Sequence, residues 1–234
     1  MKDNIQQEII NNRKIILEIR NTPNLQMLDK KGAILDDLTN LNIFKTEEWA
    51  SSDTGVKITD QQNEKEERQT IYFDLHRITY ITSKISSIDK FYNEIKKIFE
   101  VYKKYSEKSE VIRIGCRVIG TYNSKSNNFT DLVKNFEKAF PSSVFLEDFP
   151  VTDLKLTLKY ETGIYEIGPV QENDAFILKN FRFNEKISKM GFGIDTDNHI
   201  LKGTASIKNL SKIQDVLTAS LAVEKALVDK LREF

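Results

Sequence analysis

The apolar residues of this chain repeat with two different periods, and this switch of period is the strongest constraint on its fold. Between Leu154 and Tyr160 apolar and polar residues alternate, as in a strand that buries one side and exposes the other. Between Ile88 and Tyr102 the apolar residues recur at intervals of three and four and form one stripe of an amphipathic helix. A chain with both patterns buries its apolar surface by packing helices against a sheet.

The same patterns predict further elements along the chain. A helical lead-in is expected before the first strand, and the first full helix is expected to break around Gly32. The predicted strands are 13–20, two within 42–60 on either side of a turn at 53–55, 70–81, 111–122, 152–168, 174–184 and 188–198. The predicted helices are 25–38, 86–105, 130–140 with Thr130 as its cap, and 206–232.

This order of elements indicates the α+β class, with antiparallel sheets and amphipathic helices packed on them, because a doubly wound fold would alternate strands and helices regularly. A length of 234 residues allows one large domain or two small ones. The sequence has no Pro/Gly/Ser-rich linker, so we expect a single domain, residues 1–234, made of two closely packed halves, 1–122 and 123–234. Each half holds a strand, a loop and a long amphipathic helix, which leaves a degenerate duplication as an open alternative.

Composition excludes several classes of protein. The 35 basic and 35 acidic residues cancel, which argues against a dedicated nucleic-acid binder, although a local basic patch stays open. The one cysteine excludes a disulfide within the chain and fits a reducing cytoplasm. No apolar run approaches the roughly 18 residues of a membrane span, and the first residues lack the apolar core of a signal peptide. We therefore expect a cytoplasmic protein with no membrane partner.

The strand at 111–122 carries two arginines on one side. Alternation places Arg113, Gly115 and Arg117 opposite its apolar residues. The two guanidiniums could grip a phosphate or a carboxylate, and a ligand could approach over Gly115, which has no side chain. The alternative is a structural network of ion pairs.

Asp195 and Asp197 are the natural candidate partners of these arginines. Their spacing places both carboxylates on one face of a strand. A salt bridge to arginine or lysine is the favoured interpretation, and a Mg²⁺ site is the less favoured alternative. Arg113, Arg117, Asp195 and Asp197 are thus the predicted binding residues, and no metal or cofactor is predicted.

Other candidate residues favour structural roles. His76 is predicted on a strand and His199 in a turn, and neither has cysteines or carboxylates at zinc-ligand spacing. Cys116 alternates with apolar residues and is predicted to be a buried thiol. No motif of a known catalytic class occurs, so no catalytic residue is predicted. A solvated lysine face is expected on the 86–105 helix, at Lys96, Lys97, Lys103 and Lys104.

The C-terminal helix has an apolar arc wider than one core contact requires. Small residues extend this arc and allow close packing of another helix, within the chain or in a partner. The residues concerned are Ala219, Ala222, Val223, Ala226 and Leu227.

Two segments resemble a sporadically distributed family of uncharacterised bacterial proteins. The first runs from Thr70-Ile71-Tyr72-Phe73-Asp74-Leu75 through the 86–105 helix to Val111-Ile112-Arg113-Ile114-Gly115-Cys116-Arg117-Val118, and the second is Phe192-Gly193-Ile194-Asp195-Thr196-Asp197. The resemblance implies an Arg-x-Gly-Leu-Arg-Tyr strand after a helix and a later Asp-x-Asp strand. This chain departs from it: Cys116 and Val118 replace Leu and Tyr, and Ile119-Gly120 follows where Asn is expected.

The patchy distribution of that family implies a mobile gene and an accessory role. We therefore expect a non-enzymatic protein that binds a protein partner or forms a homo-oligomer, such as an accessory subunit of a bacterial mobile-element or anti-phage defence system. The alternative is a protein that binds or processes a phosphate-bearing ligand, nucleotide or nucleic acid, through the arginine strand.

Overall fold

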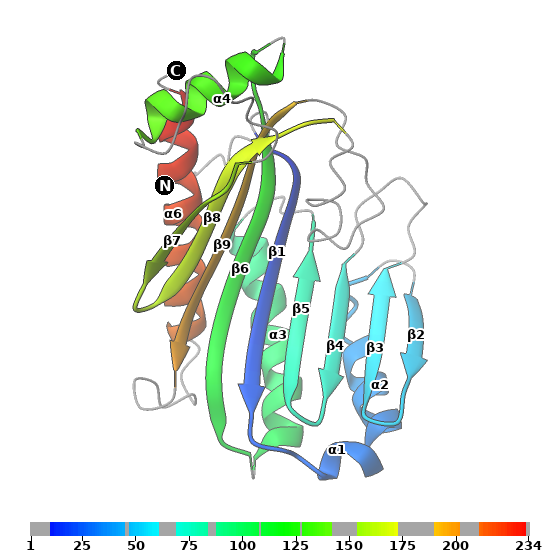
Figure 1. Cartoon of the computed structure of the whole chain (residues 1–234). Helices are drawn as coiled ribbons and strands as arrows, with labels where there is room; N and C mark the ends of the chain where they lie inside the picture. The colour runs from blue at the N-terminus through cyan, green and yellow to red at the C-terminus, as the bar shows by residue number, and fades with distance from the viewer. Residues whose placement is uncertain are drawn as a thin grey trace. The chain divides into compact units, whose positions relative to one another are not determined.

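The computed structural model has an α+β fold with an antiparallel sheet, which confirms the predicted class (Figure 1). Among the described residues the strand order is β2-β3-β4-β5-β1-β6-β9-β8-β7. The chain divides into two compact units: unit 1 contains Ile15–Cys116 and His199–Thr218, and unit 2 contains Arg117–Asn198, Ala219–Phe234 and residues 10–14. The structure describes residues 10–44, 47–60, 69–83, 88–107, 109–126, 128–141, 154–172, 190–201 and 211–232.

Unit 1 is an antiparallel sheet with helices on one side. Its strands are β1 (Ile10–Asn21, from residue 15), β2 (Glu47–Ser51), β3 (Gly55–Asp60), β4 (Thr70–Asp74), β5 (Arg77–Thr82) and the start of β6 (Val111–Asn123). Its helices include α1 (Gln26–Asp29), α2 (Lys31–Thr39) and α3 (Ile88–Ser106). Figure 1 shows α2 and α3 on the same side of these strands.

Alternation along the strands explains the core of unit 1. On β1, Ile15, Leu17 and Ile19 are buried, and their neighbours on β5 at the same level, Ile78 and Tyr80, are buried as well. The stripe of α3 faces this layer, as predicted, and the four lysines predicted on its solvated face, Lys96, Lys97, Lys103 and Lys104, are exposed. The hydrophobic burial of one sheet side therefore holds the helices on the strands.

Two local predictions in unit 1 are wrong. The single strand predicted at 70–81 is a hairpin, because the Asp74 side chain turns the chain: its Oδ1 accepts hydrogen bonds from the backbone N–H of His76 at 2.7 Å and of Arg77 at 2.9 Å. His76 is therefore an exposed turn residue, not a strand residue. The predicted break of the first helix is confirmed: α1 and α2 are separated at Lys30, whose backbone leaves helical geometry, and the nearby Gly32 is within α2.

Unit 2 combines the rest of β6 with β7 (Leu156–Tyr160), β8 (Gly163–Val170), β9 (Gly191–Leu201), α4 (Phe129–Ala139) and the end of α6 (Ser211–Arg232). The strand predicted at 152–168 is a hairpin that turns at residues 161–162, where β7 pairs with β8. The strand predicted at 174–184 and the helical lead-in before β1 lie outside the described residues.

The ends of two elements in unit 2 also differ from prediction. The cap of α4 is Asn128 instead of Thr130, because the Asn128 Oδ1 accepts a hydrogen bond from the N–H of Asp131 at 2.8 Å. The turn predicted at His199 is part of β9, so Asp195 and Asp197 lie within the strand.

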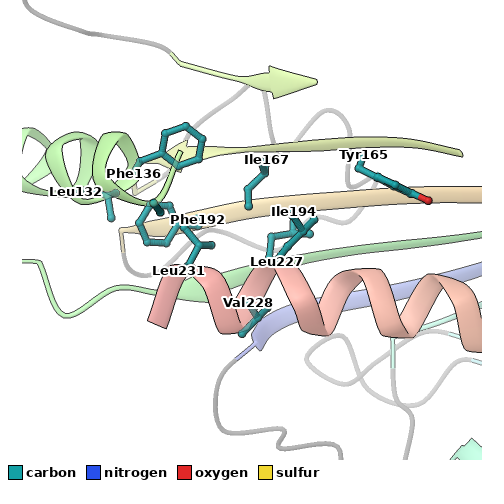
Figure 2. Packing of buried hydrophobic residues seen from close by; sticks show 10 residues of the cluster. Leu132, Phe136, Tyr165, Ile167, Phe192, Ile194, Leu227, Val228 and Leu231 are labelled. Carbon is teal, nitrogen blue, oxygen red and sulfur yellow. The ribbon is translucent and has the colours of Figure 1, made fainter. Parts of the chain in front are cut away.

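One apolar cluster fills the core of unit 2. Figure 2 shows Leu227, Val228 and Leu231 of α6 beside Phe192 and Ile194 of β9. Side chains from α4 and β8 complete the cluster. The five residues of the wide apolar arc predicted on the C-terminal helix differ in exposure. Ala219, Ala222 and Ala226 are exposed, whereas Leu227 is buried and Val223 packs against the cluster. No helix within the described ranges has both the length and the apolarity of a membrane span.

Candidate functional site

The side of the unit 1 strands that faces away from α2 and α3, here called the outer face, is polar. It consists of the residues that alternate with the buried ones, and the pairing register aligns them in rows. One row contains Lys57, Tyr72, Thr79 and Glu18, and the next contains Arg77 and Arg20.

Glu18 is the centre of the outer face. Its carboxylate accepts hydrogen bonds from Nε of Arg20 at 2.5 Å, Nη1 of Arg77 at 3.1 Å and Nη1 of Arg113 at 3.4 Å. Nε of Arg77 also donates to Oδ2 of Asp74 at 3.3 Å. The carboxylates of Glu18 and Asp74 are 12% and 11% exposed, whereas Arg20 and Arg77 are 49% and 42% exposed. The two carboxylates and Arg113, which is 16% exposed, are thus covered, whereas Arg20 and Arg77 face solvent.

The cluster of Glu18, Asp74, Arg20, Arg77 and Arg113 brings three guanidiniums to two carboxylates. Desolvation lowers the pKa of Arg77, but the charges of Glu18 and Asp74 outweigh it and raise that pKa overall. Arg77 therefore stays protonated over the whole physiological pH range.

Arg113 uses the space that Gly115 leaves. A Cβ atom at position 115 would lie 2.4 Å from Nη1 and 2.7 Å from Cζ of Arg113. The opening predicted over Gly115 is therefore filled by the neighbouring guanidinium, and it does not admit a ligand in this structure. Gly115 lets Arg113 fold back along its own strand toward Glu18.

In unit 2, Arg117 pairs with Asp195 as the salt-bridge interpretation predicts. Its Nε donates to Oδ1 of Asp195 at 2.8 Å, and its Nη2 contacts Oδ2, so the pair is bidentate. The hydrogen bonds to Asp195 raise the pKa of Arg117 against desolvation, and the charges of Asp197 and Glu166 add to this. No cluster that could hold a metal ion is found among the described histidines, cysteines, aspartates and glutamates.

The structure therefore separates the four predicted binding residues. Arg117, Asp195 and Asp197 belong to unit 2, and Arg113 belongs to the Glu18 cluster of unit 1. Cys116 is fully buried, as predicted. His199 is half-buried, and its Nδ1 has no hydrogen-bond partner among the described residues.

Sequence patterns missed the four other members of the cluster, which are Glu18, Arg20, Asp74 and Arg77. The spacing Glu18-x-Arg20 on a strand places both side chains on one face, so a contact between these two residues could have been predicted from the sequence. No local pattern indicates that Arg77 lies opposite Arg20, because this depends on the β1–β5 register.

A second buried ion pair lies in unit 2. Nη2 of Arg13 on β1 contacts Oε2 of Glu224 on α6, and the two side chains are 13% and 4% exposed. Nε of Arg13 and Oε1 of Glu224 are buried, and neither has a hydrogen-bond partner within the described part of the chain. Burial raises the pKa of Glu224 even though Arg13 lowers it.

Among known proteins, no family model matches this chain, and no curated protein does.

Proposed function

We propose that the protein is a non-enzymatic binding protein, and that the outer face of unit 1 binds an acidic segment of a partner protein. The observation that carries this proposal is the cross-strand pair of Arg20 and Arg77. Like charges directly opposite each other on neighbouring strands destabilise a sheet. Glu18 and Asp74 accept hydrogen bonds from this pair, and an anionic partner would bring further negative charge to the two exposed guanidiniums.

The arginines have hydrogen-bonding capacity left for such a partner. A guanidinium has several N–H donors, and Arg20 uses one of them on Glu18. Its side chain is about half exposed, and so is that of Arg77. Both therefore present donors to solvent in the geometry that carboxylates accept bidentately.

An acidic protein segment fits this face better than a nucleic acid. The whole chain has no net charge, so it lacks the extended basic field that attracts a polyanion. Tyr72 lies on the face, but Arg77 covers its ring at 5.6 Å from the centroid. Bases would need exposed rings to stack on. Arginine and tyrosine are, in contrast, common anchors of protein interfaces.

The proposal is tested by fluorescence anisotropy with labelled poly-glutamate at low salt. Loss of one charged hydrogen bond costs about 1 kcal/mol, so Arg20→Gln should weaken binding about 3- to 10-fold. Arg20→Glu should weaken it further. The matched control is Arg232→Gln, which removes an arginine that is 34% exposed and paired with Asp229 on α6. The control should bind as the wild type does.

A phosphate-bearing ligand is the second candidate, because the spare donors of Arg20 and Arg77 fit a phosphate as well as a carboxylate. A labelled single-stranded oligonucleotide in the same assay decides between them. Tight binding of this probe, lost in Arg20→Gln, together with no binding of poly-glutamate, would favour the phosphate function. If Arg20→Gln changes neither affinity, the outer face is a structural network and both candidates are wrong.

The family resemblance extends the proposal to the biological partner. On this proposal the partner is another component of a mobile-element or anti-phage assembly. Native mass spectrometry of the tagged protein, purified gently from its host, should show a stoichiometric companion that the Arg20→Glu variant loses.

A further inference from the structure

The strand β2 is a terminal strand of the sheet among the described residues, and its side chains are open to solvent. Glu48, Trp49, Ala50 and Ser51 are all exposed, and Trp49, at its centre, is 64% exposed. A terminal strand with an exposed aromatic residue is a template for pairing with another strand. This observation is independent of the outer-face proposal.

The β2–β3 register shows which backbone groups are open to such pairing. The N–H of Ser52 donates to the carbonyl of Gly55 at 2.9 Å, and hydrogen-bonded pairs then alternate along the hairpin. Trp49 is opposite Ile58 in a non-hydrogen-bonded pair. The N–H and C=O of Trp49 therefore face away from β3, and the same holds for Glu47 and Ser51.

We propose that two copies of this chain associate by antiparallel pairing of β2 with β2 across a two-fold axis at Trp49. In this pairing, residues whose backbone N–H and C=O point away from β3 must lie opposite residues of the same kind, because only then do hydrogen bonds form between the two copies. The register centred on Trp49 does this at every outward position: it pairs each Trp49 with its counterpart, and each Glu47 with Ser51 of the second copy. One strand thus supplies both halves of a self-complementary interface.

The side chains of β2 fit this register. It places the two Trp49 rings side by side on one face, where an aromatic cross-strand pair adds stability. It also places Glu48 opposite Ala50 of the second copy, so no two carboxylates are directly opposed. The interface has the aromatic residue at its centre and the charged residues around it, as protein interfaces commonly do.

Charge complementarity across the interface comes from β3. Lys57 is exposed and lies next to Ala50 in the same row. In the proposed dimer this row continues to Glu48 of the second copy. The Cα atoms of Lys57 and of that Glu48 would be about 10 Å apart, because they are separated by two strand spacings of about 4.8 Å each. A lysine and a glutamate can span that distance over the small Ala50 side chain. The two-fold axis creates this ion pair twice.

The dimer should be weak, because two strands of five residues bury less surface than the roughly 1,000 Å² of a stable interface. Sedimentation velocity over a concentration series tests it directly. Trp49 is the only tryptophan in the sequence, so its fluorescence should shift to shorter wavelength as the dimer forms. This second readout needs no substitution.

Three variants locate the interface. Trp49→Ala and Ser51→Pro should each weaken association at least tenfold; the proline removes an outward N–H that β3 does not use. The matched control is Tyr160→Ala, which removes a 60% exposed aromatic residue from β7, the terminal strand at the other end of the described sheet. It should leave association unchanged. Circular dichroism verifies that each variant is folded.

A charge exchange tests the register. Glu48→Lys and Lys57→Glu should each weaken the dimer, and the double variant should restore it. The proposal is overturned by a protein that stays monomeric at all concentrations with constant tryptophan fluorescence. It is also overturned by a dimer that Trp49→Ala and Ser51→Pro leave intact, or by one that Tyr160→Ala dissociates.

Discussion

Arg20 and Arg77 lie directly opposite each other on neighbouring strands, and both donate hydrogen bonds to the carboxylate of Glu18. The glutamate is therefore what makes this like-charge pair tolerable in the sheet. Arg113 adds a third guanidinium to the same carboxylate. On the binding proposal, stability and binding would depend on different members of one cluster.

Glu18→Gln should destabilise the protein by about 1–3 kcal/mol, because it leaves three guanidiniums with a weaker acceptor and removes the negative charge beside two opposed arginines. Arg20→Gln should change the free energy of unfolding by less than about 0.5 kcal/mol, since it removes the most exposed member and relieves the repulsion. Urea denaturation of both variants measures the two effects. A Glu18→Gln variant as stable as the wild type would mean that the carboxylate does not hold the cluster.

Gly115→Ala should lower the free energy of unfolding by about 1 kcal/mol, because the new Cβ would collide with the Arg113 guanidinium and displace it from Glu18. In an Arg113→Ala background the same substitution should be neutral or stabilising, since alanine suits a strand better than glycine. Chemical denaturation of the four proteins of this double-mutant cycle gives the coupling energy. If Gly115→Ala lowered the free energy of unfolding equally in the wild type and in the Arg113→Ala variant, Gly115 would be needed for another reason.

Two buried tyrosines in unit 1, Tyr80 and Tyr102, differ in the hydrogen bonding of their hydroxyl groups. No hydrogen-bond partner of the buried Tyr102 hydroxyl is found among the described residues, and burial raises the pKa of Tyr102 to about 12. The Tyr80 hydroxyl instead donates to Glu94 at 2.7 Å and accepts from Gln69 at 3.1 Å. Tyr102→Phe should therefore be neutral or stabilising, whereas Tyr80→Phe should cost about 1–2 kcal/mol. Thermal unfolding should separate the two variants by several degrees, and the reverse order would contradict this account.

The fold class was predictable because strand and helix patterns are local. The alternation at 154–160 and the stripe of α3 each need a short stretch of sequence. The β4–β5 turn was not found, because Asp74-Leu75-His76 contains no glycine or proline and the turn depends on the Asp74 side chain.

Less of the candidate site was predictable. The alternation of Arg113 and Arg117 placed both on one face, and the pairing of Arg117 with Asp195 is the predicted kind of contact. The convergence of Arg20, Arg77 and Arg113 on Glu18 depends on strand order and register. These are set by long-range packing, and no local pattern contains them.

The Arg13–Glu224 pair predicts how stability depends on pH. Burial raises the folded-state pKa of Glu224 above its value of 4.5 in an exposed chain. The folded protein then binds a proton more tightly than the unfolded chain does, so this group stabilises the fold below pH 4.5, and that contribution is lost as pH rises through the folded pKa. Removing one partner with Arg13→Ala should destabilise the protein at pH 7 by about 3 kcal/mol, because it leaves a buried charge unpaired.

Replacing both partners, as in Arg13→Met with Glu224→Leu, should recover most or all of this loss, since Nε of Arg13 and Oε1 of Glu224 have no hydrogen-bond partner among the described residues and each carries a desolvation cost. The double variant should also lose the pH dependence that Glu224 contributes. Urea denaturation from pH 4 to pH 8 measures both effects. A double variant less stable than Arg13→Ala would show that the ion pair is a net source of stability in unit 2.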